Sequence, residues 1–173
     1  DELVEQARTN MGVRTVLMIP PLMHGAAQWA VFNVVSTGGW IAIPDHVDHL
    51  DAESALRLAE RERVLSIPVV GDAVARPLLD EIETGKYDLS GLVTVTNGGA
   101  PLSPTVRDRL LAALPNLMVI DAVGSSESGM QMTTMAAKGI DTGAGFAPHA
   151  LGDARAERAA AEQQLICAFC GPG

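Results

Sequence analysis

Two short stretches carry residue types that could bind a flat, phosphorylated ligand: residues 97–101, which read NGGAP, and residues 121–127, which read DAVGSSE. The adjacent glycines of the first allow positive φ and let a planar group lie against the backbone. The serine hydroxyls of the second can donate to phosphate oxygens, and the carboxylate of Glu127 can hold Mg²⁺. Each stretch also has a simpler interpretation: a strand-to-helix turn for the first and a solvated serine-rich turn for the second.

The second stretch also approaches the GxSxG signature of serine hydrolases. Gly124 and Ser126 fit this signature, but Ser128 stands where it requires glycine. A hydrolase that uses Ser126 as its nucleophile therefore stays open as an alternative function. The first stretch does not fit a phosphate-binding loop, because no lysine follows it and its nearby prolines lack amide donors.

Three further groups are weaker candidates. His24 lies in an apolar setting typical of a core residue, but it follows a predicted strand and a pair of prolines, which favours a ligand-facing position. Residues 45–51 (DHVDHLD) match no strong zinc spacing, so we interpret them as a polar lead-in to a helix capped by Asp51. The lone CxxC at residues 167–170 has no second pair, and we expect no metal or redox role for it.

The elements that must position these residues alternate along the chain. Short apolar runs predict strands, and the runs between them predict helices, the first of which is almost wholly apolar and is expected to be buried. The expected strands are 15–19, 40–44, 64–68, 90–96 and 117–121, and the expected helices are 22–37, 51–64, 71–85 and 103–114. Since the strands are continuously apolar, the pattern predicts an α/β fold with a largely parallel sheet flanked by helices. Ligands of such sheets gather at the carboxyl ends of the strands, where both stretches lie.

The composition of the chain indicates which classes of binding partner are disfavoured and which cellular location is expected. The formal charge of −9 makes nucleic acid a poor partner, because such a surface repels phosphate backbones. No apolar run approaches the ~20 residues of a transmembrane helix, and the polar opening is unlike a signal peptide. We therefore expect a cytoplasmic protein. The strand–helix rhythm stops near the end, so we expect a domain over residues 1–146 and a divergent tail over 147–173 that is disordered or read out of frame.

Four motifs follow one another with fitting spacing within residues 10–146: PPLMHGAAQW, LSIPVVGDAVARPLLDEI, DLSGLVTVTNGGAPLSPTVRDRLLAALP and VIDAVGSSESG. In this order they resemble the AMP-forming fatty-acyl-CoA synthetases of the adenylate-forming superfamily, and most closely the actinobacterial type. The resemblance implies part of the large N-terminal adenylation domain. It also implies a ligase that uses ATP and Mg²⁺ to turn a fatty acid into an acyl-adenylate, from which coenzyme A displaces AMP.

The resemblance assigns roles to individual residues. Residues 97–101 are similar to the adenine-binding segment, and residues 121–127 to the loop beside the phosphates. Ser126 then stands beside phosphate oxygens, Glu127 binds Mg²⁺, and His24 borders the acyl pocket, with Trp29 on the acyl side. The full set of implied nucleotide-binding residues is Asn97, Gly98, Gly99, Ala100, Pro101, Asp121, Ala122, Val123, Gly124, Ser125 and Ser126.

The chain also departs from the family pattern. Val123 stands where an aromatic residue commonly stacks on adenine. The family's phosphate loop, its ribose-binding Asp, and its C-terminal domain with a catalytic Lys are not recognisable. We therefore expect an internal fragment that is inactive in isolation and that self-associates through faces exposed by truncation. The alternative is a non-catalytic remnant that acts as an interaction module or is the product of a pseudogene.

Overall fold

The computed structural model describes residues 15–125, 129–141 and 147–148. Within them, one mixed sheet has the strand order β2-β1-β3-β4-β5-β6-β7, and β8 also pairs with β6. The first five strands in this order are mutually parallel, whereas β6 runs antiparallel to β5, β7 and β8. The strands are β1 (Thr15–Leu17), β2 (Trp40–Ala42), β3 (Ser66–Val69), β4 (Thr94–Gly98), β5 (Met118–Ser125), β6 (Gly129–Ala137), β7 (Ile140–Asp141) and β8 (Ala147–Pro148). The predicted α/β fold is confirmed.

Local sequence signals explain where the helices begin. The helices are α2 (Gly25–Ser36), α3 (Ala52–Arg61), α4 (Gly71–Ile82) and α5 (Pro104–Ala113). The Asp51 carboxylate accepts a hydrogen bond from the Ser54 amide at the start of α3, as the sequence predicts. Ser103 caps α5 in the same way, and Pro104 occupies the first helical position, where no amide donor is needed.

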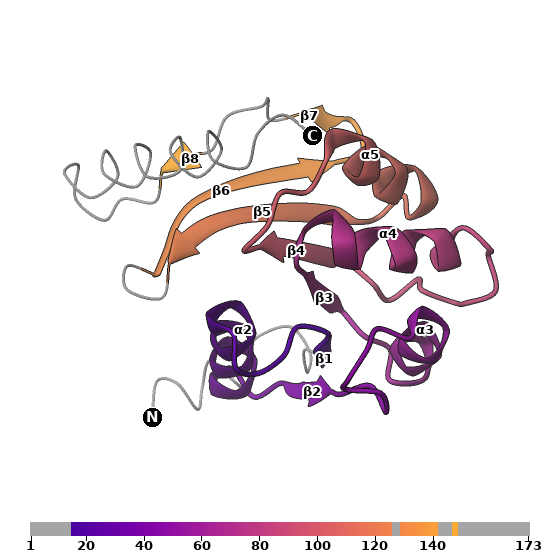
Figure 1. Cartoon of the computed structure of the whole chain (residues 1–173). Coiled ribbons are helices and arrows are strands. Elements are labelled where there is room, and N and C mark those ends of the chain that lie inside the picture. The colour runs from indigo at the N-terminus through magenta and orange to yellow at the C-terminus, as the bar shows by residue number, and fades with distance from the viewer. Residues whose placement is uncertain (1–14, 126–128, 142–146, 149–173) are drawn as a thin grey trace.

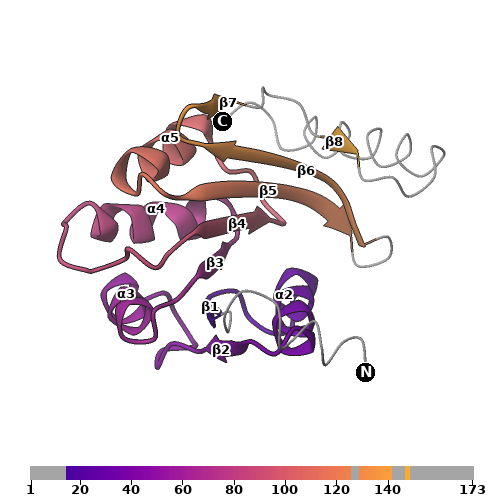
Figure 2. The same cartoon turned by 180° about the vertical axis from the view of Figure 1, so that it is seen from behind.

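The helices cover the two faces of the sheet unequally. Helices α3, α4 and α5 lie on one face and α2 lies on the other (Figures 1 and 2). In the larger core, α3, α4 and α5 pack against the strand side chains that point toward them, among them Leu17, Ile67 and Val119. The smaller core joins α2 to Val16 and Met18, which point the opposite way from Leu17 because successive strand residues alternate.

The expectation that the first helix is buried is wrong in one respect. Only Ala27 and Val34 of α2 are buried, while Phe32 is 73% and Val35 is 58% exposed. A helix packed on a sheet buries one side only, and this helix is apolar on the other side as well. Composition alone could not distinguish this arrangement from full burial.

Strands β4 and β5 both end later than expected, although β4 also begins later, at Thr94 instead of residue 90. We predicted strands that end at residues 96 and 121, but β4 includes Asn97-Gly98 and β5 continues to Ser125. The extension of β5 follows from its pairing with β6, whose register runs from Met118 opposite Ala137 to Ser125 opposite Gly129. The segment expected to be a loop from residue 121 onward is therefore strand as far as residue 125.

The end of the chain is described in part. Of the predicted tail, only Ala147–Pro148 is among the described residues, where it pairs with β6. The division at residue 146 therefore stays a prediction. Among the described helices, none has the length and apolar character to cross a bilayer.

Candidate functional site

The parallel pairing of β4 and β5 brings the two candidate stretches side by side. Asn97 lies opposite Asp121, and Gly98 lies opposite Ala122. The predicted adjacency at the carboxyl ends of neighbouring strands is thus present for residues 97–98 and 121–122. The roles assigned to these residues stay predictions, since no ligand is present.

Asn97 joins three separate parts of the chain. Its side-chain oxygen accepts a hydrogen bond from the Gly71 amide at 2.7 Å. Its Nδ2 donates to the Ala100 carbonyl at 2.9 Å and to Asp121 Oδ1 at 2.8 Å. The residue is only 2% exposed. Because both amide hydrogens are used within the protein, the Asn97 side chain holds the shape of the segment instead of offering those donors to a ligand.

The first residues of α4 contact residues 100–103. Gly71 has φ +61°, and a Cβ there would lie 2.7 Å from Ala100 Cβ and 2.8 Å from the Pro101 carbonyl oxygen. The Asp72 amide donates to that carbonyl at 3.2 Å, and Asp72 Oδ1 accepts from the Ser103 amide at 2.8 Å. Sequence analysis missed these contacts. The only local signal for them is a Gly-Asp pair between a strand and a helix.

The contacts of Asp72 favour the ionised form of its carboxyl group. Burial alone would raise the pKa of its carboxyl group, but hydrogen bonds from Ser103 and the ion pair with Arg76 outweigh burial and lower the pKa. Asp72 is therefore ionised at neutral pH, and its carboxylate can hold the loop before α5 through a charge-assisted hydrogen bond.

A Cβ at either of the two glycines at the end of β4 would meet only ordinary van der Waals contacts. Gly99 needs its glycine because its φ is +79°. Gly98 has no positive φ, and a Cβ there would meet only the Ala122 carbonyl oxygen at an ordinary 3.6 Å. The protein's own packing therefore does not require glycine at residue 98. A planar group lying against this backbone would require it, because a Cβ would stand in its way.

The described part of β5 contributes a carboxylate and a short exposed end. Burial raises the pKa of Asp121, although hydrogen bonds from Asn97 and from the Ala122 backbone oppose that effect. Val123 is half-buried, and Gly124 and Ser125 are exposed. No aromatic side chain stands at residue 123, so a planar ligand here would rest on aliphatic and backbone surface.

The remaining candidates lie at different places. His24 precedes α2 as its N-cap residue, and its exposed side chain makes no capping hydrogen bond. It follows β1, which β3 separates from β4, so it lies at the same sheet edge but not beside residues 97–101. Ser126, Glu127 and Ser128, and the CxxC at 167–170, lie outside the described residues.

Comparison with known proteins gives consistent results. The family described as "AMP-binding enzyme" matches residues 2–155. The medium-chain acyl-CoA ligase Mig of Mycobacterium avium is 50% identical over 139 residues, which are 80% of this chain and 25% of that protein. The 3-oxocholest-4-en-26-oate–CoA ligase of Rhodococcus rhodochrous is 40% identical over 134 residues, which are 73% of this chain and 23% of that protein.

A solved structure supports the fold. A long-chain-fatty-acid–CoA ligase from Archaeoglobus fulgidus superimposes with a TM-score of 0.61 at 20% identity, over 76% of this chain and 29% of that one. The chain spans about a quarter of the length of the curated relatives it matches. Since these relatives are ligases, they lend no support to the serine hydrolase alternative.

Proposed function

Because the chain belongs to the AMP-binding enzyme family, we propose that it forms part of a ligase that activates a fatty acid with ATP and passes the acyl group to coenzyme A. The observation that carries this proposal is the pairing of Gly98 with Ala122, at a glycine that the protein's own packing does not require. The similarity to ligases named for medium-chain and sterol-derived acids supports a carboxylic acid substrate. The length of the acyl chain is left open.

In this proposal, residues 98–101 receive the adenine ring. The ring lies along the backbone at Gly98 and Gly99, where a Cβ would occupy its space. Hydrogen bonds from Asn97 and from the start of α4 keep the segment in this shape before the nucleotide arrives. Preorganisation of this kind raises affinity because less conformational freedom is lost on binding.

The phosphate side is assigned to the residues that follow β5 in the sequence. Ser126 donates its hydroxyl to phosphate oxygens, and Glu127 holds Mg²⁺, for which carboxylate oxygens are the preferred ligands. When bound, Mg²⁺ supplies positive charge that offsets the repulsion between the substrate carboxylate and the α-phosphate. Ser125, which pairs with Gly129, fixes the point at which the connection between β5 and β6 begins.

The reaction is a pair of displacements. A carboxylate oxygen of the acid attacks the α-phosphorus of ATP, the bond to pyrophosphate breaks, and an acyl-adenylate forms. The sulfur of coenzyme A then attacks the acyl carbon, and AMP leaves. His24, exposed at the start of α2, borders the acyl side of this arrangement. A cytoplasmic location stays a prediction from composition.

A polypeptide of these 173 residues is expected to be inactive alone, since it spans about a quarter of its relatives. ATP–pyrophosphate exchange with a panel of fatty acids tests this expectation directly. We expect no exchange above a protein-free control. Sustained exchange by the purified chain would overturn the expectation of inactivity but not the assignment of the adenine segment.

The adenine assignment has its own test. Titration of the ¹⁵N-labelled chain with AMP should shift backbone amide signals of residues 98–100 and 122–125. Gly98→Ala should weaken AMP binding by at least about tenfold, or about 1.4 kcal/mol, while the protein stays folded. Gly91→Ala is the matched control, because Gly91 also lacks a positive φ and a Cβ there would meet only ordinary contacts. Shifts elsewhere, no shifts at millimolar AMP, or unchanged binding by Gly98→Ala would overturn the assignment.

A further inference from the structure

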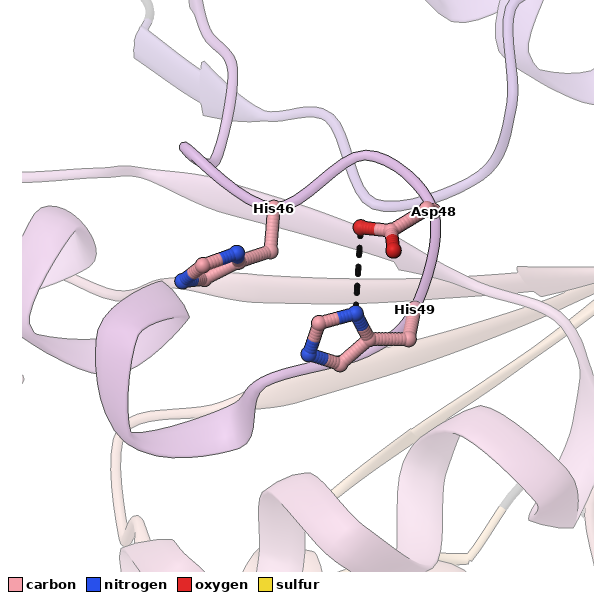
Figure 3. Close-up of side chains that lie close together, drawn as sticks. All are labelled: His46, Asp48 and His49. Carbon is pink, nitrogen blue, oxygen red and sulfur yellow. Dashed lines mark hydrogen bonds and ion pairs between the residues drawn. The ribbon is translucent and has the colours of Figure 1, made fainter.

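The connection between β2 and α3 gathers three metal-ligating side chains. His46, Asp48 and His49 each offer one ligand atom, and these atoms lie within 4.8 Å of one another (Figure 3). His49 Nδ1 lies 3.0 Å from Asp48 Oδ1, and the two imidazole rings are 5.0 Å apart between centroids. The sequence interpretation of this segment as a lead-in to a helix is confirmed for the Asp51 cap. The same interpretation set metal binding aside because the spacing matches no zinc signature, whereas the structure brings three possible ligand side chains together.

The surroundings of the cluster favour a cation. Asp45 and Asp51 flank the three residues, and Asp51 Oδ2 lies 3.9 Å from His46 Nε2. In the described part of the chain, no lysine or arginine forms an ion pair with Asp48 or Asp51. The seven residues 45–51 contain three carboxyl groups, two imidazoles and no lysine or arginine.

We propose that this loop binds a divalent transition metal ion, best matched by Zn²⁺, through one nitrogen each of His46 and His49 and a carboxylate oxygen of Asp48. Imidazole and carboxylate are ordinary ligands for Zn²⁺, whereas Mg²⁺ prefers oxygen ligands alone. Water completes the tetrahedral set.

The geometry needs little adjustment. Ligand atoms at about 2.0–2.2 Å around a tetrahedral Zn²⁺ lie about 3.3–3.5 Å from each other. The distance between His49 Nδ1 and Asp48 Oδ1 is already near this separation, so an ion can take the place of this hydrogen bond. Side chains of His46 and His49 are 51% and 59% exposed, which leaves them free to rotate toward a common centre.

The site is separate from the proposed nucleotide segment. It follows β2 at one edge of the sheet, and β1 and β3 lie between β2 and β4. A bound ion would fix the connection into α3 rather than take part in acyl transfer. It should therefore raise the midpoint of thermal unfolding, because a ligand that binds only the folded state stabilises that state.

The test uses the full chain with Cys167→Ser and Cys170→Ser, so that the two thiols cannot hold the metal. Isothermal titration with Zn²⁺ should show one site at micromolar metal, and excess Mg²⁺ should not compete. His46→Ala and His49→Ala should each weaken binding by at least about tenfold, a loss of the size seen for metal-site partners. His24→Ala is the matched control, since His24 is also exposed but lies at the start of α2.

Circular dichroism establishes that each variant is folded before its affinity is compared. Absence of binding at micromolar Zn²⁺ would overturn the proposal. Full binding by the His46→Ala/His49→Ala double variant, or an equal loss in His24→Ala, would do so as well. Co²⁺ provides a second readout, because a tetrahedral site with two imidazoles should give visible absorption that disappears in the double variant.

Discussion

Asn97 accepts one hydrogen bond and donates two, and all three reach chain segments other than its own strand. A buried amide in this position keeps the Gly71 amide and the Ala100 carbonyl paired away from water. Removal of the side chain would leave both groups without this partner. The residue therefore affects stability and the shape of the proposed adenine segment together.

We expect Asn97→Ala to lower the free energy of unfolding by about 1–3 kcal/mol, the usual penalty for a buried polar group left unpaired. Urea denaturation followed by circular dichroism measures this change. Asn33→Ala on the exposed side of α2 is the control and should stay within about 0.5 kcal/mol of the parent. Similar losses for the two variants would contradict the structural role given to Asn97.

Asp121 makes the stability depend on pH. Its folded-state pKa is raised by burial, so its contribution is fully present below the unfolded pKa and is lost as pH rises through the folded pKa. Asp121→Asn keeps an oxygen that can accept from Asn97 and removes the charge. We expect this variant to match the parent in thermal unfolding near pH 3.5 and to be more stable at pH 7.

A control separates this effect from a general response to lost charge. Asp108→Asn removes an exposed carboxylate from α5, which pairs with Arg107. Its difference from the parent should be small at both pH values. A stability gain for Asp121→Asn that is the same at pH 3.5 and pH 7 would show that burial of the carboxylate is not the cause.

Among the helices and strands, the features that could be predicted best are those set by residues close together in the sequence. The caps of α3 and α5 were predictable because Asp51 and Ser103 act on amides within three residues. The length of β5 was not, because glycine and serine in AVGS have little strand preference and only pairing with β6 makes them strand. The composition of α2 likewise did not indicate which part of the sheet the helix packs against.

The candidate site likewise has one feature that the sequence predicts and others that it does not. The adjacency of residues 97–98 and 121–122 could be predicted, since parallel strands end at one edge. The contacts of Gly71 and Asp72 could not, because each joins residues more than 25 positions apart. Residues whose side chains could do chemistry can be recognised in the sequence by their type. Residues that hold a backbone segment in place through distant contacts cannot be recognised from their neighbours in the sequence.

The turn into α4 provides a paired test at this scale. Gly71 and Gly85 both have positive φ, at 61° and 69°. A Cβ at Gly85 would meet nothing within 4 Å, whereas at Gly71 it would overlap Ala100 and Pro101. Gly85→Ala should cost about 1–2 kcal/mol from the backbone alone.

Gly71→Ala should cost a further ~1–3 kcal/mol, because the added methyl group must displace the neighbouring loop. Chemical denaturation gives the two energies, and amide signals of residues 99–103 should move only in the Gly71 variant. Equal energies, or an undisturbed loop, would show that α4 does not support the candidate site.

At the scale of the whole molecule, the outer side of α2 is the most apolar exposed surface of the described helices. Phe32 and Val35 are largely exposed, Trp29 is 38% exposed, and α2 contains no charged residue. Contiguous apolar surface of this kind is typical of an interaction face. The net charge of −9 repels copies of the chain from one another, but covering the outer side of α2 would remove no charged side chain from water.

We expect the chain to self-associate through α2 as its concentration rises. The Phe32→Gln/Val35→Gln double variant should shift light scattering after size exclusion toward the mass of one chain. Val47→Gln is the matched control, since Val47 is 79% exposed but lies in the β2–α3 connection. Unchanged association of the double variant would exclude α2 as the contact.

The long sequence separations bridged by Asn97 have a kinetic consequence. Its partners Gly71 and Asp121 lie 26 and 24 residues away, on either side along the chain, so these bonds can close only after the start of α4 and strands β4 and β5 have come together. We therefore expect these contacts to form after the rate-limiting step of folding. In stopped-flow measurements, Asn97→Ala should therefore accelerate unfolding far more than it slows refolding, and the lifetime of the native state would depend on one amide.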